Sequence, residues 1–218
     1  MTTFDSSPTE VWTALSRSSA HLAYSFLDAS TDFSIPVVVG VRQSPSNDMK
    51  TILACSASLS KADCVSKVIR DLNAQSINFR VVRDVPDQIE NFTMLQHGAT
   101  YMAHVDRSGT FDKMLRGKNI EFHHNGTKGE MTPSDKLRYL IKQIESLGKE
   151  AFAVDLSTRE SLALGLYVVK VLVPGLQPLP YHYRCRYLGS NRLHQVASHL
   201  IGKDYQEDDV NKWPIPFA

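Results

Sequence analysis

The chain has 218 residues, of which 42% are hydrophobic and 22% charged, and its net charge is +1. This length suits one large domain or two small ones, with a core that buries roughly 70% of the unfolded surface. The near-neutral charge does not favour nucleic acid or an anionic membrane as a partner, and no apolar run approaches the roughly 20 residues that span a bilayer.

The cysteines and the N-terminus indicate a reducing compartment. Cys55, Cys64 and Cys185 are sparse, odd in number and without a CxxC spacing. This pattern predicts free thiols that pack as small hydrophobic groups, rather than a disulfide framework or a zinc site. The segment MTTFDSSPTE has neither the basic nor the apolar region of a signal peptide. We therefore expect a cytoplasmic protein.

The first quarter of the chain predicts strands joined by turns. IPVVVGV at 35–41 is nearly all apolar, which predicts a strand buried on both faces. QSPSND at 43–48 has the composition of a turn, so residues 35–57 are expected to form a hairpin. The expected elements are a short helix at 8–19 and strands at 22–27, 35–41 and 50–57.

The segment 61–80 predicts an amphipathic helix with Ser60 as its N-cap. Its apolar positions fall on one stripe, made of Val65, Val68, Ile69, Leu72 and Phe79. Residues 87–102 are expected to form one or two helices. The polar, glycine-punctuated stretch 109–129 predicts a surface loop.

A further helix begins at Thr132 and Pro133, as N-cap and N1, and ends at Gly148. Its expected buried stripe consists of Leu137, Leu140, Ile141, Ile144 and Leu147. Two strands should follow, at 151–156 and 166–173. The second strand belongs to VVKVLVPGLQPL, residues 168–179, in which a run expected to be buried breaks on a rigid Pro-Gly turn.

A last helix is expected at 190–200, with Leu193, Val196, Ala197 and Leu200 facing inward. The chain then ends in a tail that is first acidic and then rich in proline and aromatic residues. This order of helices and strands predicts an α/β (α+β) fold, in which a mixed sheet is covered by helices.

Common catalytic signatures such as GxxxxGK[ST], GxGxxG, HExxH and GxSxG do not occur in the sequence. His123 and His124 lie in a polar stretch without a third ligand at zinc-like spacing, which favours a solvated pair over a metal site. Asp71 and Gln75 are four residues apart and share a helix face. That face is either a solvated edge or a carboxylate and an amide presented to a Mg²⁺–phosphate group.

A basic cluster follows the PGLQPL turn. It contains His182, Arg184, Arg186 and Arg192. One interpretation is a solvated positive edge. The alternative is an anion clamp, because the planar guanidinium group of arginine matches phosphate and carboxylate.

Several segments, taken in order, resemble one family. LVPGLQPL followed by RYLGSNRL is similar to the C-terminal signature of YcaO-domain proteins, and VDLSTRESLALGLYVVKV resembles the strands that lead into it. The stretch from IPVVVGV to NAQSINFR resembles the central block of the family, with its hairpin and its helix carrying Glu-x-x-x-Gln. LQHGATYM and the tail WPIPFA complete the match, which covers most of residues 20–218.

The resemblance implies ATP- and Mg²⁺-dependent chemistry on peptide backbone amides, such as formation of thiazole and oxazole precursors in ribosomally made peptides. Asp71 and Gln75 fall on the Glu-x-x-x-Gln positions, which makes both candidates for nucleotide binding and Asp71 a candidate ligand of Mg²⁺. Arg184 and Arg186 are further candidates for binding the nucleotide. The resemblance also places Pro214, Pro216 and Ala218 in a tail that reaches toward the active site in cyclodehydratases of the family.

The chain departs from the family pattern in two respects. Asp71 keeps the charge of the family's glutamate but is one methylene shorter, and metal–ligand distances are strict. Family members are also typically at least twice as long, and their N-terminal half supplies a motif with serine and glutamate. SRSSAHLAYSFLD contains no glutamate. The sequence therefore predicts a single domain over 1–218 that resembles the C-terminal half of a YcaO domain, with 201–218 as its tail.

Such a chain is a split enzyme, a degenerate partner subunit or an excised piece. The first hypothesis is a cyclodehydratase subunit that acts on a precursor peptide and needs a second chain to supply the missing half or to bind the leader peptide. The alternative is a non-catalytic scaffold or regulator that binds a partner protein or the precursor peptide.

Overall fold

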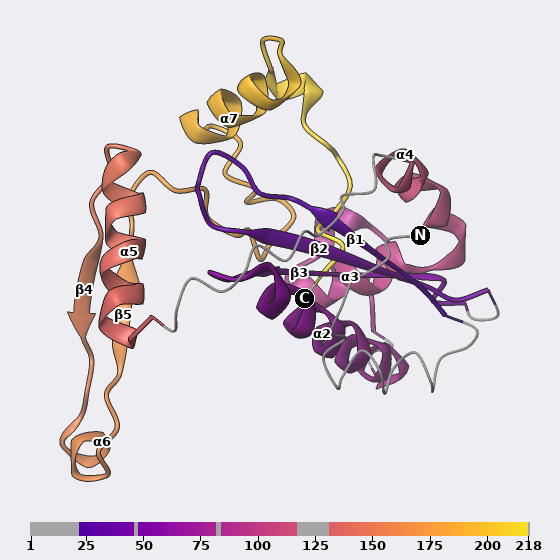
Figure 1. The fold of residues 1–218 in the computed structure, drawn as a ribbon. Coiled ribbons are helices and arrows are strands. Elements are labelled where there is room, and N and C mark those ends of the chain that lie inside the picture. Colours follow the sequence, from indigo (N-terminus) through magenta and orange to yellow (C-terminus); the bar gives the residue numbers. More distant parts are fainter. Residues whose placement is uncertain (1–21, 46–47, 82–83, 117–130, 218) are drawn as a thin grey trace.

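The computed structural model describes residues 22–45, 48–81, 84–116 and 131–217. The helix predicted at 8–19 and the pair His123–His124 lie outside the described residues. The strands form two separate antiparallel sheets, one with the order β1-β2-β3 and one with the order β4-β5. Helices accompany both sheets (Figure 1). The α/β class is therefore confirmed, with its strands divided between two sheets.

The first sheet is a meander of three strands. It consists of β1 (Ala23–Asp28), β2 (Val37–Gln43) and β3 (Thr51–Ala57), close to the ranges that the sequence predicts. β2 lies in the middle and pairs Gly40 with Phe26 on one side and with Ala54 on the other. Because side chains alternate along a strand, β2 contributes to both faces, as its apolar sequence predicts.

Helix α2 (Lys61–Val81) packs across β2 and β3 and buries one face of this sheet. Every residue of its predicted stripe is buried, with Val68, Ile69 and Leu72 fully enclosed. The Ser60 hydroxyl accepts a hydrogen bond from the backbone N–H of Asp63 (3.4 Å), so the predicted N-cap is confirmed. The helix lies so close to the sheet that a Cβ at Gly40 would stand 2.1 Å from a methyl carbon of Val68.

The opposite face is covered by a short 3₁₀ turn η1 (Ile89–Asn91) and α3 (Leu95–Ala103), followed by η2 (Val105–Phe111) and α4 (Asp112–Leu115). Val41, Leu53, Met102 and Phe111 form the buried core on this side. Two short helices over 87–102 agree with the sequence. The loop predicted from 109 is wrong at its start, because residues 109–115 continue in helical turns that carry Phe111 into the core.

A second unit contains α5 (Pro133–Ser146), β4 (Phe152–Asp155), α6 (Arg159–Ala163) and β5 (Val169–Leu172). Thr132 caps α5 by accepting a hydrogen bond from the N–H of Asp135 (3.2 Å), with Pro133 in the first turn. Gly148 adopts the left-handed conformation at the helix end (φ +65°). The predicted helix boundaries are therefore confirmed.

The burial predicted for this second unit is wrong. No residue of α5 is buried, and Leu137 of the expected stripe is 59% exposed. All four residues of β5 are exposed, although VVKVLV predicts an interior strand. The physical reason is that β4 and β5 form only a two-stranded sheet, and the described residues leave between 42% and 61% of each large apolar side chain in these strands exposed.

Helix α7 (Asn191–Ile201) follows the PGLQPL turn and ends at Gly202, which is left-handed (φ 72°). Its predicted inward face is only partly enclosed, and Leu200 is 58% exposed, contrary to expectation. Arg192 at its start donates two hydrogen bonds to the Asp32 carboxylate, at 2.7 and 2.8 Å, and so ties α7 to the β1–β2 connection. None of the helices in the described ranges has the length and apolarity to cross a membrane.

We expect the Asp32–Arg192 pair to contribute about 1 kcal/mol of stability at neutral pH. The hydrogen bond from Arg192 holds the pKa of Asp32 below its ordinary value of 3.8. Since the folded-state pKa is the lower one, the contribution is present above the ordinary value and is lost as the pH falls through the folded-state pKa. Arg192→Gln should therefore destabilise the protein at pH 7 and be neutral at about pH 2.

Urea unfolding of both proteins at the two pH values checks this expectation. Arg138→Gln is the matched control, because the Arg138–Asp135 pair is largely exposed and should contribute little. A stability difference between Arg192→Gln and the unchanged protein that persists in acid would contradict the ion-pair interpretation.

Candidate functional site

Helix α2 carries the first pair of predicted site residues. Asp71 and Gln75 lie one turn apart, so they share a face as their spacing predicts. Gln75 is only 5% exposed, whereas the Asp71 side chain retains 35% of its surface in solvent. Gln75 is therefore enclosed by the fold, whereas Asp71 lies on the partly solvated edge of the helix.

The Asp71 carboxylate accepts a hydrogen bond from the Lys67 ammonium (2.8 Å), which lies one turn earlier on α2. An exposed pair at this spacing contributes only about 0.3–0.5 kcal/mol, so a divalent cation displaces it at little cost. The oxygen donors of Asp71 and Gln75 are the types that Mg²⁺ prefers, and Mg²⁺ sites often use one or two carboxylates together with phosphate oxygens. This donor set fits one part of a Mg²⁺–phosphate site.

The described ranges contain no cluster of three or more histidine, cysteine, aspartate or glutamate side chains that could hold a metal ion by itself. A Mg²⁺ ion at Asp71 would complete its six oxygen ligands with water, nucleotide phosphates or other protein groups. All three cysteines are free; Cys64 is enclosed in the core and Cys185 is exposed. Burial raises the pKa of the Cys64 thiol, which keeps it protonated at neutral pH.

Arg184 and Arg186 are each bound to a backbone carbonyl. Arg184 donates from Nε to the carbonyl of Glu90 (2.9 Å), and Arg186 donates from Nη1 to the carbonyl of Asn211 (2.8 Å). The Arg186 guanidinium also lies over the ring of Tyr183, 4.9 Å from its centroid. These contacts hold η1 and the C-terminal tail in place. Together with the Asp32–Arg192 pair, they give each arginine of the cluster a partner that is distant in sequence.

The C-terminal tail returns to the first sheet and packs on α3. Pro214 is buried, and Phe217 packs against the core that Val41 and Met102 help to form. Tyr183 donates its hydroxyl to the carbonyl of Lys212 (2.5 Å). The carbonyl of Ile215 lies only 2.6 Å from the position that a Cβ of Gly98 would take. The tail therefore fits α3 because residue 98 is glycine.

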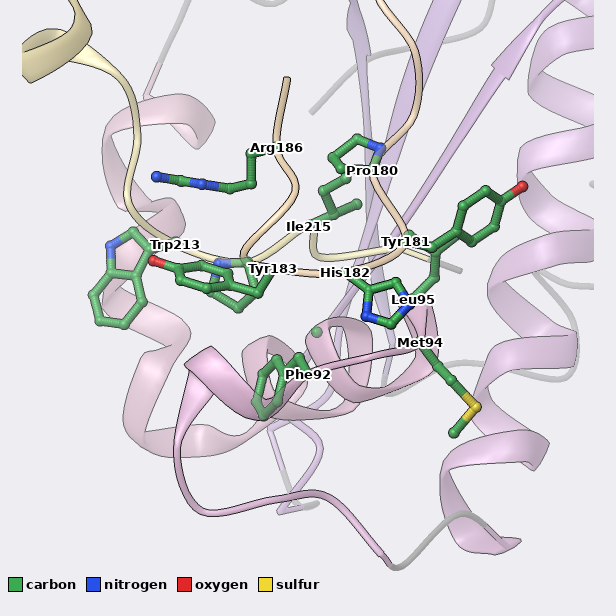
Figure 2. Close-up of a pocket in the computed structure, with 12 residues that line it drawn as sticks. Phe92, Met94, Leu95, Pro180, Tyr181, His182, Tyr183, Arg186, Trp213 and Ile215 are labelled. Carbon is green, nitrogen blue, oxygen red and sulfur yellow. The ribbon is translucent and has the colours of Figure 1, made fainter. Parts of the chain in front are cut away.

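A pocket of about 40 Å³ opens where the tail meets α3 (Figure 2). Its lining includes the aromatic side chains of Phe92, Tyr181, Tyr183 and Trp213, with Arg186 at one side. This volume holds a few water molecules or one small side chain, because a single water needs roughly 10–15 Å³. It is too small for a nucleotide. Pro214 contributes to the lining, Pro216 is partly buried, and Ala218 lies outside the described residues.

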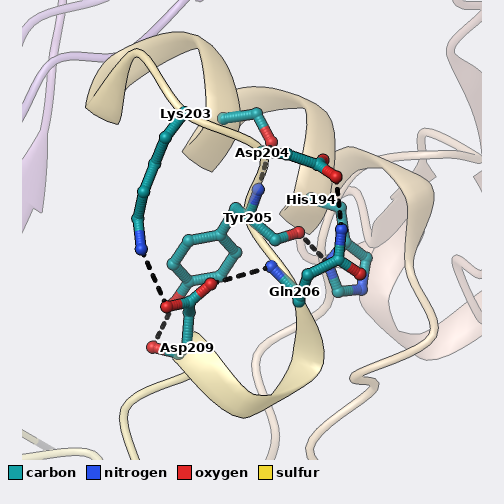
Figure 3. A network of polar contacts seen from close by, with 7 residues as sticks. His194, Lys203, Asp204, Tyr205, Gln206 and Asp209 are labelled. Carbon is teal, nitrogen blue, oxygen red and sulfur yellow. Dashed lines mark hydrogen bonds and ion pairs between the residues drawn. The ribbon is translucent and has the colours of Figure 1, made fainter.

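A polar network fixes the first part of the tail, which directly follows α7 (Figure 3). The Lys203 ammonium lies 2.9 Å from the Asp209 carboxylate, which also accepts a hydrogen bond from the N–H of Gln206 (3.1 Å). The ring of His194 lies between two backbone carbonyls, those of Tyr205 and Leu188. The predicted tail 201–218 thus begins as an ordered turn with its own 3₁₀ helix η3 (Glu207–Asp209), which directs the following residues toward α3.

Sequence reasoning missed Gly98 and Tyr183, although both hold the tail. A signal for Gly98 was present, since an isolated glycine inside a helical segment often marks a close approach of another backbone. Tyr183 had no signal, because its partner is a carbonyl 29 residues later in the chain.

Comparisons with known proteins extend this description. A family model described as YcaO cyclodehydratase, ATP- and Mg²⁺-binding, matches residues 5–177. No curated protein matches the chain. Among solved structures, the chain resembles a heterocyclase in complex with substrate and cofactor (TM-score 0.65, 20% identity) over 96% of its own length and 27% of that protein. It resembles the heterocyclase TruD (TM-score 0.68, 19% identity) over 99% of its length and 28% of that protein.

The match to the family model ends at Gln177, whereas the matches to the two solved structures cover nearly the whole chain. The family model covers the first sheet, α2 and the second unit, whereas the segment with Arg184, Arg186 and the tail is matched by the two structures alone. At these identities the structures show a shared fold, and the chain spans little more than a quarter of their length. The resemblance found in the sequence is confirmed by the family model over most of the chain: the protein belongs to the YcaO family.

Proposed function

We propose that this chain is a subunit of an ATP-dependent, YcaO-type peptide cyclodehydratase, whose ATP site is completed by a partner chain. The observation that carries the proposal is the pair Asp71 and Gln75 on α2. The pair lies inside the segment matched by the family model, at the spacing of the family's Glu-x-x-x-Gln, with Gln75 buried beside a carboxylate that solvent reaches.

In this proposal, Asp71 and Gln75 hold Mg²⁺ with the nucleotide phosphates. When bound, ATP supplies the phosphoryl group that converts a backbone amide oxygen of the precursor peptide into a good leaving group. Asp71 would hold the metal together with Gln75, and Lys67, which now donates a hydrogen bond to Asp71 (2.8 Å), would supply a positive charge close to the phosphates. The tail, held on α3 by Tyr183 and Gly98, is the candidate for closing the peptide site.

A non-catalytic scaffold is the second candidate, and two observations favour it. Asp71 is shorter than the family's glutamate, and Arg184 and Arg186 are already hydrogen-bonded to backbone carbonyls of Glu90 and Asn211. In this case the chain binds a partner protein or the precursor peptide without using ATP.

Titration calorimetry with Mg²⁺–ATP separates the two functions. We expect no binding to the chain alone, and binding once the chain is combined with its partner; the polypeptides encoded beside its gene are the ones to try. Asp71→Glu restores the reach of the family's carboxylate and should tighten binding by the complex by about tenfold, or about 1.4 kcal/mol.

Asp63→Glu is the matched control, since Asp63 is an exposed aspartate on the same helix and should leave affinity unchanged. If neither the chain nor any complex binds Mg²⁺–ATP, the enzymatic proposal fails and the scaffold remains. Binding by the chain alone would refute the claim that a partner completes the site.

A further inference from the structure

The second unit exposes an apolar surface that a folded protein does not normally leave to water. Figure 1 shows β4, β5, α5 and α6 to one side of the first sheet. In the two strands, the large apolar side chains are between 42% and 61% exposed. The exposed set comprises Leu137, Ile141, Phe152, Val154, Leu156, Leu162, Leu164, Leu166, Tyr167, Val168, Val169, Val171 and Leu172. Exposed patches of this kind mark interaction surfaces.

Both faces of the hairpin are exposed. The register pairs Phe152 with Leu172, which places these two side chains on one face, and Ala153 with Val171, which places Val171 on the other. Phe152 is 50% exposed and Val171 is 61% exposed, so both faces keep a large apolar area in contact with solvent. A two-stranded hairpin in water is at best marginally stable, and further strands or a helix packed on its face are needed to secure it.

The outer edge of β5 is also open. The N–H of Leu156 donates to the carbonyl of Val168 (2.8 Å), which fixes the phase of the antiparallel ladder. Lys170 and Leu172 therefore direct their backbone groups toward β4, and Val169 and Val171 direct theirs outward. Within the described residues, β5 pairs with β4 and with no other strand. An apolar edge with a single charge is a template for pairing with another strand.

We propose that a second polypeptide adds a β-strand to the outer edge of β5 and covers the two faces of the β4–β5 hairpin. The two solved heterocyclases carry nearly three quarters of their length outside the part that this chain matches, which is chain enough for such a strand and the helices around it. A second copy of this chain fits less well. Edge-to-edge pairing of two β5 strands would leave every apolar side chain of both faces in water.

This inference shares with the proposed function the premise of a partner chain, but it is tested by association and not by nucleotide binding or turnover. The tagged full chain is co-expressed with each polypeptide encoded beside its gene, and light scattering after gel filtration gives the composition of the purified species. We expect one partner to form a one-to-one complex. In that complex, amide exchange of Val169 and Val171 should slow relative to the chain alone, whereas Lys170 and Leu172 already bond to β4 and should change less.

Val171→Pro removes an outward N–H without breaking a hydrogen bond to β4, and it should weaken the complex by at least about tenfold. Ala153→Pro does the same at the outer edge of β4 and is the matched control that should retain affinity. The exchange measurement on the unchanged protein decides the matter if a proline variant does not fold.

A homodimer with protected Val169 and Val171 amides, a complex weakened by Ala153→Pro alone, or no complex at all would each overturn the proposal. A complex that forms through β5 without binding Mg²⁺–ATP would support the docking surface and refute the enzymatic function. If instead a complex binds Mg²⁺–ATP and its assembly is not weakened by Val171→Pro, the enzymatic function is supported and the docking surface on β5 is refuted.

Discussion

Alanine in place of Gly40 is expected to lower the free energy of unfolding by about 2–3 kcal/mol, because overpacking a filled core displaces side chains that have nowhere to go. A Cβ at this position would lie 2.1 Å from a methyl carbon of Val68, 3.3 Å from Leu72 and 3.4 Å from Phe26. Val68 and Leu72 have no exposed surface. Helix α2 must therefore move away from the sheet to admit one methyl group.

Urea unfolding monitored by circular dichroism measures this loss. Gly109→Ala is the matched control: a Cβ there meets nothing within 4 Å, so its stability should be unchanged or raised by up to about 1 kcal/mol. Equal stability of the two variants would contradict the close packing of α2 on β2. Because α2 also carries Asp71 and Gln75, a shift of the helix in the Gly40→Ala variant should weaken any Mg²⁺–ATP binding as well.

The close approach at Gly40 also explains why this half of the fold could be predicted from sequence. The stripe Val65, Val68, Ile69 and Leu72 has a helical period, and the alternating sides of IPVVVGV offer it a flat apolar face. Local pattern and tertiary packing agree here, because both partners of the contact lie within about 40 residues of the same chain. Such agreement between local pattern and fold is what makes an element predictable.

The segment VVKVLV shows why burial, unlike strand formation, could not be predicted from the sequence. Its composition correctly predicts the strand β5, but it predicts burial only on the assumption that something covers the strand. Burial depends on the partner as well as on the strand, and the described residues supply only β4. The same reason applies to Leu137 of α5. In both places the sequence contains an apolar surface, and the described part of the chain leaves much of that surface exposed.

The candidate site divides in the same way. The spacing of Asp71 and Gln75 places both side chains on one helix face, so their proximity could be predicted from the sequence alone. The partners of Arg184 and Arg186 are backbone carbonyls of Glu90 and Asn211, and a carbonyl is the same group in every residue. No residue type therefore marks these partners, and only the fold could reveal that the two arginines hold segments of backbone.

Replacing Gly98 by alanine is expected to release the C-terminal tail from α3. A Cβ at residue 98 would lie 2.6 Å from the carbonyl oxygen of Ile215 and 3.2 Å from Pro214. Gly98 lies inside α3, where alanine favours the helix by about 0.5–1 kcal/mol, so the helix should persist while the tail is displaced. We expect the amides of the non-proline residues within 211–217 to exchange about tenfold faster, which corresponds to about 1.4 kcal/mol of lost docking energy.

Tyr183→Phe removes one hydrogen bond to the tail, the one to the Lys212 carbonyl, and should raise exchange by a smaller factor of about five. Gly109→Ala again serves as the control, with no change in the tail. If the tail takes part in peptide modification, Gly98→Ala should reduce product formation by the complex as far as deletion of 213–218 does, with the helix content of both variants intact. Unchanged tail exchange in Gly98→Ala would refute the contact itself. If the tail is released in Gly98→Ala but product formation is unchanged, the contact between Gly98 and the tail is confirmed and the tail has no role in the reaction.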